Sequence, residues 1–300
     1  MTSAINRRQF ARLAGLGGVA FASGLFAQTP GGRAWAASEA KEFYFVQLSD
    51  THWGFQGPKV NPEPTHALPM AIEAVNDMKP APDFVVFTGD LTHTTDDAQE
   101  RRRRMGEFKD QLKALKIKEV HFLPGEHDAS LDSGAAFKEF FGETHYTFDH
   151  KGVHFIALDN VSDPGAALGD AQLAWLQADL AKLSKKQPIV VLTHRPLFDL
   201  YPHWDWATKD GAKAIDLLTP YEHVTVFYGH IHQINSHMTG NIAHYAAQSL
   251  IFPQPAPGSA PQRAPVPWDA SAPFKGLGWR SVEADPKKAA ETFSDRPLKA

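Results

Sequence analysis

Short apolar runs rich in β-branched and aromatic residues recur along the chain, and helical patterns separate them. Such alternation predicts strands joined by helices, which build parallel or mixed sheets with helices packed outside. Two later segments, residues 145–160 and 236–249, instead place turn residues between two apolar runs and predict hairpins. The pattern therefore predicts an α/β fold, and the mixture of crossovers and hairpins favours stacked mixed sheets flanked by helices.

Every predicted parallel strand is followed directly by residues that can bind a metal ion. The first strand closes on D-T-H, the second on G-D, the third on G-E-H, and two later strands on T-H and G-H-I-H. Because the carboxyl ends of neighbouring parallel strands meet at one edge of a sheet, these side chains are expected to lie close together. Strand alternation would aim the aspartate and the histidine of D-T-H at one point. The candidates are Asp50, His52, Asp90, Glu126, His127, His194, His230 and His232.

A structural role is the alternative for each candidate taken alone. An isolated carboxylate can cap a turn, and an isolated histidine can be a hydrogen-bonded core residue. These alternatives fail together, because three carboxylates grouped at buried strand ends would repel one another and lose solvation. Cations between them remove that problem. The chain has no cysteine, so histidine, carboxylate or amide groups must hold any metals. The mixture of carboxylates and imidazoles suits manganese, iron or zinc better than calcium or magnesium.

The motifs D-x-H, G-D, G-N-H-[DE], H and G-H-x-H, in this order, are the signature of the calcineurin-like metallophosphoesterases, which this chain resembles over residues 42–232. The resemblance implies a four-layer sandwich of two mixed β-sheets flanked by α-helices, with two metal ions. It implies hydrolysis of phosphoesters through attack by a metal-bridging hydroxide, with His127 as general acid. By position it assigns Asp50, His52 and His232 to one ion, Asp90 to both, and Glu126, His194 and His230 to the other.

The family's third motif usually carries asparagine where this chain has Glu126. Glutamate keeps an oxygen donor but adds a methylene group and a negative charge. With two divalent ions, a hydroxide and two aspartates, a formal charge of about +1 would fall to about zero. Two interpretations stay open. The glutamate replaces asparagine as a ligand without further effect, or the site favours a monoanionic phosphodiester or a trivalent iron.

A second departure concerns the general acid. Relatives often carry an acidic residue where this chain has His93, three residues after Asp90, and that acid supports the catalytic histidine. The group that orients His127 is therefore left open. The adjacent Asp128 is expected to point away from it.

The leading hypothesis is an exported binuclear phosphoesterase whose partner is a small-molecule phosphoester, with phosphodiesters slightly favoured. The alternatives are a phosphomonoesterase for nucleotides or sugar phosphates, and a catalytically impaired periplasmic protein that binds metal. A net charge of -4 and a pI near 6.4 give no reason to expect a nucleic-acid partner.

The first residues carry an export pattern. Paired arginines in Asn6–Arg12 precede a weakly apolar stretch rich in Gly and Ala, and Ala34 and Ala36 supply small residues for cleavage. This pattern resembles a twin-arginine signal spanning residues 1–36. Its uncharged segment of about 15 residues is shorter than the ~20 that a bilayer span needs. We therefore expect export by the twin-arginine machinery to the periplasm or the medium, with no stable membrane anchor after cleavage.

The remaining chain is expected to form one domain, because roughly 260 residues fit a single large α/β domain. Residues 37–284 are assigned to this metallophosphoesterase domain. Within it, the Pro-rich residues 253–273 predict an extended strap over the surface. Residues 285–300 are assigned to a C-terminal tail.

Overall fold

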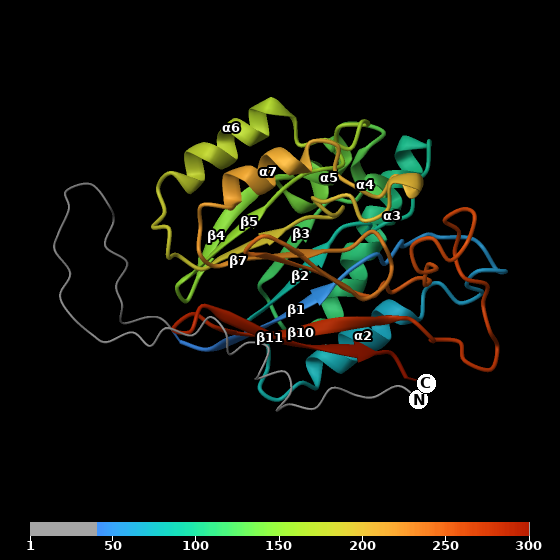
Figure 1. Cartoon of the computed structure of the whole chain (residues 1–300). Helices are drawn as coiled ribbons and strands as arrows, with labels where there is room; N and C mark the ends of the chain where they lie inside the picture. Colours follow the sequence, from blue (N-terminus) through green and yellow to red (C-terminus); the bar gives the residue numbers. More distant parts are fainter. Residues whose placement is uncertain (1–40, 300) are drawn as a thin grey trace. The chain divides into compact units, whose positions relative to one another are not determined.

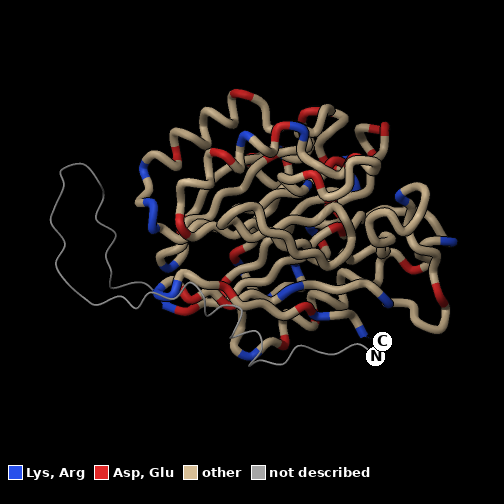
Figure 2. Tube along the Cα trace, in the orientation of Figure 1, with Lys and Arg blue, Asp and Glu red and all other residues tan. Residues whose placement is uncertain are grey.

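The computed structural model describes residues 41–299 (Figure 1). The predicted export signal of residues 1–36 lies outside the described residues. Within residues 41–299, no helix combines the length and the apolar character that a membrane crossing requires. Acidic and basic residues lie on both sides of the sheets (Figure 2).

The first sheet has five strands in the order β11-β10-β1-β2-β3. β1, β2 and β3 run parallel, and β10 runs antiparallel to β1. The register sets Leu48 opposite Phe87 and Thr88 opposite Leu123, so the carboxyl ends of the three parallel strands are nearly level. Its strands are β1 (Phe43–Leu48), β2 (Phe84–Thr88), β3 (Val120–Leu123), β10 (Gly278–Asp285) and β11 (Ala290–Pro297).

The second sheet has six strands in the order β4-β5-β6-β7-β9-β8. β5, β6, β7 and β9 are parallel, whereas β4 and β8 form antiparallel hairpins with β5 and β9. Both predicted hairpins are thus confirmed. Its strands are β4 (Tyr146–His150), β5 (Val153–Ala157), β6 (Ile189–Leu192), β7 (Val224–Tyr228), β8 (Asn235–Thr239) and β9 (Ile242–Ala246).

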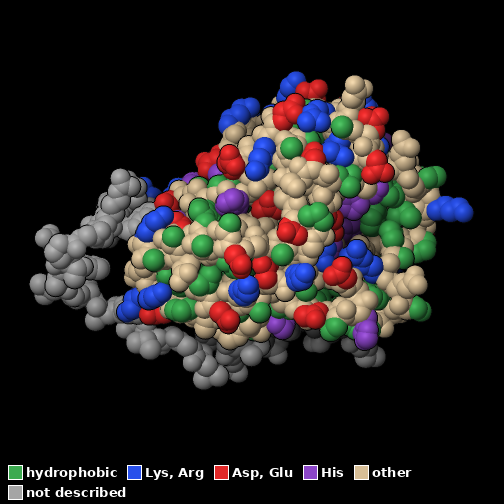
Figure 3. Space-filling view, turned by 90° about the horizontal axis from the view of Figure 1, so that it is seen from above, with side chains coloured by type: hydrophobic (Ala, Val, Ile, Leu, Met, Phe, Trp, Pro, Cys, Tyr) green, Lys and Arg blue, Asp and Glu red, His purple; other side chains and the backbone are tan. Residues whose placement is uncertain are grey.

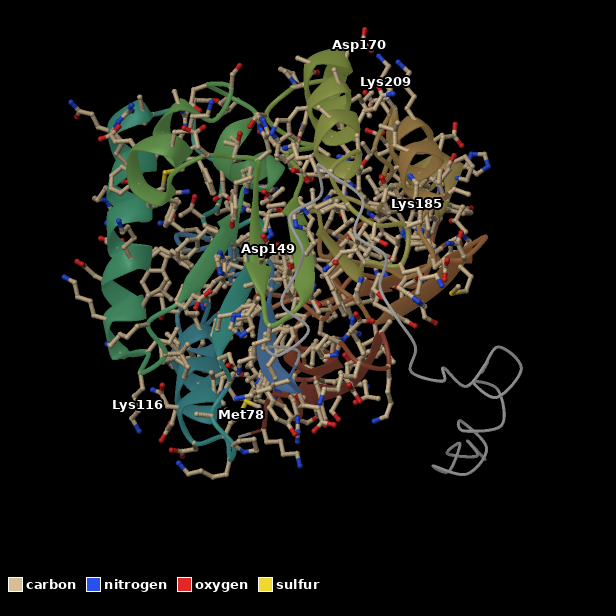
Figure 4. All side chains as sticks on the ribbon, turned by 90° about the vertical axis from the view of Figure 1, so that its left-hand side faces the viewer. Met78, Lys116, Asp149, Asp170, Lys185 and Lys209 are labelled. Atoms are coloured by element: carbon tan, nitrogen blue, oxygen red, sulfur yellow. The ribbon has the colours of Figure 1, made fainter. Side chains whose placement is uncertain are left out.

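Helices cover the outer face of each sheet, which confirms the predicted layers (Figure 1). α2, α3 and α5 bury apolar side chains against the first sheet, and α6 and α7 do so against the second. In Figure 4, Met78 and Lys116 lie on the side of α2 and α3, and Asp170 and Lys185 lie on the opposite side. The helices are α2 (Ala67–Asn76), α3 (Ala98–Gln111), α4 (Glu126–Ala129), α5 (Ala135–Phe141), α6 (Gly169–Leu180) and α7 (Gly211–Leu218), with short 3₁₀ turns at Leu112–Ala114 and Pro202–Trp204.

Aromatic side chains fill the space between the two sheets. Phe45 of β1 stacks on Phe84 of β2 at 5.2 Å between ring centroids. Phe155 of β5 and Phe227 of β7 each meet Phe45 edge-on at 5.7 Å. All four side chains are completely buried, and each such burial is worth about 1.5–3 kcal/mol. This interlayer core fixes the two sheets face to face and so fixes where their strand ends lie.

The predicted C-terminal tail is wrong as a structural assignment. β10 extends to Asp285, and β11 (Ala290–Pro297) pairs with it along its whole length. β11 is an edge strand with mostly exposed polar side chains, so it lacks the apolar signal of the inner strands. Its Phe293 packs on Tyr245 at 4.6 Å and under Arg280. Residues 285–297 therefore belong to the first sheet.

Asp83 connects the two sheets at the amino end of β2. Its carboxylate accepts a hydrogen bond from the Tyr44 backbone N–H at 3.2 Å and another from Lys151 Nζ. Lys151 belongs to the turn between β4 and β5, and His150 Nε2 lies 3.3 Å from the same carboxylate. Burial acts to raise the pKa of Asp83, but the hydrogen bonds from Lys151 and Tyr44 outweigh it and lower the pKa.

Replacing Asp83 with Asn is expected to lower the free energy of unfolding by about 1–3 kcal/mol at pH 7, because Lys151 loses its charged partner. The carboxyl group has a lowered pKa in the folded protein. Its contribution is therefore present above the unfolded pKa and lost as the pH falls through the folded value. Urea unfolding at pH 7 and pH 3 should show a difference between variant and wild type that shrinks on acidification. A difference of equal size at both pH values would contradict this role.

Candidate metal centre

All seven predicted metal ligands come together at the carboxyl ends of the strands. They lie in the loops after β1, β2, β6 and β7 and in the first turn of α4, which follows β3. Their donor atoms form two groups, within each of which the atoms lie within 4.8 Å of one another. The first group is Asp50, His52, Asp90 and His232, and the second is Asp90, Glu126, His194 and His230.

The loop after β1, rather than strand alternation, aims the D-T-H pair. β1 ends at Leu48, so Asp50 and His52 lie beyond it, with left-handed φ values of 54° and 43°. The prediction that Asp50 and His52 point to one place is therefore correct, but the reason given for it, alternation along a strand, is wrong. The Asp50 N–H donates to Gly89 O at 3.0 Å and the His52 N–H to Asp90 O at 2.9 Å. These two bonds tie the loop to the one after β2.

Left-handed backbone recurs through the centre. Five ligand residues have positive φ, a conformation that costs a non-glycine residue about 1–2 kcal/mol. Such conformations persist where the surrounding structure over-determines them, and they cluster at functional sites. The five are Asp50, His52, Asp90 (50°), His230 (64°) and His232 (53°).

Two motif glycines permit the close approach of these loops. A Cβ atom on Gly125 would lie 2.1 Å from Asp90 Oδ1, and one on Gly229 would lie 2.0 Å from Ser49 Oγ. Any larger residue would push the ligand loops apart. The glycines of G-E-H and G-H-I-H are thus required by packing.

In the first group, Nε2 atoms and carboxylate oxygens face a common space. His232 Nε2 lies 3.3 Å from both Asp50 Oδ1 and His52 Nε2. Asp90 Oδ2 lies 3.3 Å from His52 Nε2. The Asp50 carboxylate is held by the His230 backbone N–H at 3.1 Å. The four donors surround one position from different sides.

The second group shares the same Asp90 oxygen. His194 Nε2 lies 3.3 Å from Asp90 Oδ2 and 3.0 Å from Glu126 Oε2. His230 Nδ1 lies 2.8 Å from Glu126 Oε1. Because one oxygen of Asp90 faces the histidines of both groups, this residue is placed to bridge two cations.

Backbone carbonyls fix the tautomers of two ligand histidines. His194 donates from Nδ1 to Thr88 O at 2.7 Å, and His232 donates from Nδ1 to Phe252 O at 2.7 Å. A histidine whose Nδ1 carries the proton presents an Nε2 lone pair, as a metal ligand must. Both Nε2 atoms point into the cluster.

The unpaired atoms of the cluster fit cations. His194 Nε2 and Glu126 Oε2 are buried, and neither makes a hydrogen bond within the described part of the chain. Burial acts to lower the pKa of His194, yet the carboxylates of Asp90 and Glu126 raise it well above its ordinary value. The carboxylates therefore draw positive charge to this position. The residues present fit two metal ions bound by oxygen and imidazole donors.

Glu126 has a charged neighbour that the sequence argument missed. Arg195 Nη1 lies 3.8 Å from Glu126 Oε1, and the Arg195 side chain is buried. Its guanidinium also donates to the backbone carbonyls of Asp205 and Ala207. Arg195 directly follows the predicted ligand His194, and this position next to a ligand was the only hint of its role in the sequence. The positive charge of Arg195 therefore offsets part of the extra negative charge that Glu126 brings in place of the family's asparagine.

His127 lies at the rim of the first group and is oriented without an acidic side chain. The Thr94 backbone N–H donates to His127 Nδ1 at 3.2 Å. The His127 ring stacks on His93 at 4.7 Å and meets His52 edge-on at 4.6 Å. His93 Nδ1 in turn lies 3.1 Å from His52 Nδ1. His93 thus contacts a metal ligand as well as His127, and the backbone of Thr94 supplies the hydrogen bond.

Asp128 turns away from His127, as predicted. Its carboxylate accepts hydrogen bonds from the backbone N–H groups of Gly125 at 2.9 Å, Leu91 at 2.9 Å and Thr92 at 2.8 Å. Burial raises its pKa to about 6, and the charge of Asp90 contributes to the shift. Asp128 therefore joins the loop after β2 to the loop after β3.

Histidine side chains reach the surface beside a group of hydrophobic side chains (Figure 3). Two mixed sheets between helices, with donors for two cations at their strand ends, define a metal-dependent phosphoester hydrolase. Residues 43–234 match the calcineurin-like phosphoesterase family, and the chain belongs to that family. The predicted fold and enzyme class are thereby confirmed.

Similar proteins act on phosphoesters, as their names state. The chain is 30% identical over 217 residues to a probable glycerophosphodiester phosphodiesterase of Arcobacter nitrofigilis, covering 68% of this chain and 77% of that protein. It is 28% identical over 217 residues to the serine/threonine-protein phosphatase CPPED1 of Mus musculus, covering 64% and 70%. The structure of a dimetal phosphatase from Danio rerio aligns with a TM-score of 0.55 at 13% identity, covering 86% of this chain and 99% of that one.

The pairing of Glu126 with Arg195 is expected to appear as non-additive stability. Glu126→Asn alone leaves a buried guanidinium without its carboxylate, and Arg195→Met alone leaves the carboxylate uncompensated. In the chelator-treated protein, the double variant should be more stable than the sum of the single effects predicts, by about 1 kcal/mol. Urea unfolding of the four proteins measures this coupling. Additivity within about 0.3–0.5 kcal/mol would show that the two side chains act independently.

Proposed function

We propose that the protein is an exported binuclear metallohydrolase that cleaves phosphodiesters. The observation that carries this proposal is the pair of donor groups sharing Asp90 Oδ2, with His127 at their rim. Two metal ions bound there would supply a hydroxide nucleophile near neutral pH and neutralise charge on the phosphate oxygens. Manganese, iron and zinc fit the mixed carboxylate and imidazole donors.

His127 is assigned the role of general acid. Because its Nδ1 accepts a hydrogen bond from the Thr94 N–H, the proton of the ring is on Nε2. To act as general acid toward the departing alkoxide, the ring must be in its imidazolium form, because a neutral imidazole is far too weak an acid. In that form Nδ1 is protonated and gives up the bond from Thr94, while Nε2–H passes its proton to the departing oxygen. The His127 backbone N–H donates to Asp90 Oδ1 at 2.9 Å, so the acid is tied to the bridging ligand.

The preference for phosphodiesters is supported by the relative named as a glycerophosphodiester phosphodiesterase. A monoanionic diester also suits a centre whose third carboxylate, Glu126, lowers the positive charge. Phosphomonoesters are the second candidate. The positive charge of Arg195 beside Glu126 favours them, since a monoester carries more negative charge.

A substrate panel tests the reaction and the preference. After manganese or iron loading, the protein should hydrolyse bis-p-nitrophenyl phosphate faster than p-nitrophenyl phosphate. The reverse order would favour the monoesterase. The absence of turnover with any metal, together with activity gained on Glu126→Asn, would instead favour a metal-binding protein that has lost catalysis.

The same panel isolates the role of His127. His127→Ala should keep the metal content and lose about 10²–10⁴-fold in kcat on esters with poor alkyl leaving groups. The loss on p-nitrophenyl esters should be much smaller, because that leaving group departs without a proton. Metal analysis provides the control for a damaged centre. Equal losses on both kinds of ester would contradict the acid role.

Export is supported by the arginine pair within Asn6–Arg12 and by Ala34 and Ala36. Replacing Arg7 and Arg8 with Lys in the full chain should retain the protein in the cytoplasm of a bacterial host that exports the wild type. Fractionation and N-terminal sequencing read out the location and the cleavage after about residue 36. Unchanged export of the variant would exclude the twin-arginine route.

A further inference from the structure

The strap after β9 folds back on itself and encloses a cavity. Residues 253–277 contain no helix or strand, yet backbone hydrogen bonds hold them in place. The Val266 N–H donates to Pro253 O at 2.9 Å, and the Trp268 N–H donates to Lys59 O at 3.3 Å. The first bond joins the two arms of the strap, and the second ties one arm to the loop after β1. The cavity beside these bonds measures about 350 Å³, a volume typical of small-molecule sites.

Apolar side chains form most of the cavity wall, namely Val60, Ile251, Phe252, Val266, Trp268 and Leu277. The polar side chains of the wall are committed elsewhere or lie in solvent. Asn61 donates from Nδ2 to Ile251 O at 2.7 Å and accepts at Oδ1 from the Glu63 N–H at 2.9 Å. Asp269 and Lys275 are exposed, and the Asp269 carboxylate accepts from the Ser271 N–H at 2.9 Å. The cavity therefore suits an uncharged, apolar group.

Two large apolar side chains of this wall are only partly covered by the protein. Trp268 is 37% exposed and Val266 is 39% exposed. Contiguous exposed apolar surface on a soluble protein marks an interaction site or a ligand groove. A group that filled the cavity would take part of this surface out of water, which is favourable.

Phe252 connects the cavity to the metal centre. Its ring lies 4.6 Å from the ring of His232 and 5.6 Å from the ring of His52, measured between centroids. Its backbone carbonyl accepts the hydrogen bond from His232 Nδ1 at 2.7 Å. Phe252 thus contacts two ligand histidines and also lines the cavity.

Phe55 extends this apolar surface toward the proposed general acid. Its ring meets Phe252 at 5.3 Å and His93 at 5.0 Å, and His93 stacks on His127 at 4.7 Å. Figure 3 shows hydrophobic side chains gathered beside the histidines that reach the surface. The apolar surface is therefore continuous with the place where an ester group would leave the phosphate.

We propose that the cavity under the strap binds an apolar ester group of the substrate while the metal centre holds its phosphate. The inference rests on the proposed function and narrows it to phosphoesters of apolar alcohols, alkyl or aromatic. An ester group is bonded to the phosphate itself, so it must occupy the surface beside the metal centre. Phe252 and Trp268 both line the cavity and would pack on the bound group.

Phosphonates of increasing apolar length test the inference by binding, because their carbon–phosphorus bond is not hydrolysed. The ligands are methylphosphonate, hexylphosphonate and phenylbutylphosphonate. Calorimetry on the manganese-loaded protein should show about tenfold tighter binding of hexylphosphonate or phenylbutylphosphonate than of methylphosphonate, which corresponds to about 1.4 kcal/mol. The preferred ligand should also give a more negative heat-capacity change, the marker of apolar burial.

Variants of the wall locate the preference. Trp268→Ala should reduce it to about threefold or less at equal metal content, and Trp268→Phe should restore most of it. Ala272→Leu, which narrows the cavity and removes no apolar surface, should also reduce it. Trp175→Ala is the matched control and should keep the preference, because Trp175 lies on α6 and packs on His145.

Three results would overturn the inference. The loaded wild type could bind all three phosphonates equally, or Trp268→Ala could keep the full preference. The metal-free wild type could also bind hexylphosphonate as tightly as the loaded protein does, and the cavity would then be a separate apolar site, for a protein or a lipid.

Failure of the proposed function has a different outcome. If the loaded protein hydrolyses no phosphoester but shows the Trp268-dependent preference, the cavity assignment stands and the catalytic proposal fails. If it hydrolyses phosphoesters without any preference among the phosphonates, the catalytic proposal stands alone.

Discussion

Mutual repulsion among three carboxylates at one buried sheet edge is the constraint on which the structure depends. Asp50, Asp90 and Glu126 can lie in one cluster because imidazole rings lie among their carboxylates. Backbone N–H groups also donate hydrogen bonds to Asp90 and Asp50. The carboxylates of Asp90 and Glu126 raise the pKa of His194, so this edge of the sheet attracts positive charge. Cations can balance the repulsion, since they are small and can contact several oxygens at once. The arrangement of this cluster is therefore the one expected of a site that binds two metal ions.

The fold supports this cluster by holding two independent sheets in alignment. Asp50, Asp90 and Glu126 come from the first sheet, and His194, His230 and His232 come from the second. Neither sheet alone holds a complete donor group. The aromatic layer around Phe45 and Phe155 sets the distance between the sheets, so interlayer packing and metal geometry are linked. A shift of one sheet along the other would separate Asp90 from His194.

Much of this arrangement could be predicted from the sequence, because periodicity and motif order are local signals. Strand positions, both hairpins and the grouping of the ligands follow from them. The polar edge strand β11 could not be recognised, since its pairing with β10 depends on backbone bonds rather than apolar side chains. The partner of His127 was also hidden, because a backbone N–H of Thr94 leaves no trace in residue type. The offset of Glu126 by Arg195 required knowing which loops meet.

The left-handed backbone of the ligand residues determines how substitutions at these positions would affect the stability of the protein. Five side chains are kept in a backbone conformation that glycine would adopt without penalty. Replacing one of these ligands by glycine would therefore relieve backbone strain as well as repulsion, whereas replacing it by alanine would remove the donor and keep the strained backbone.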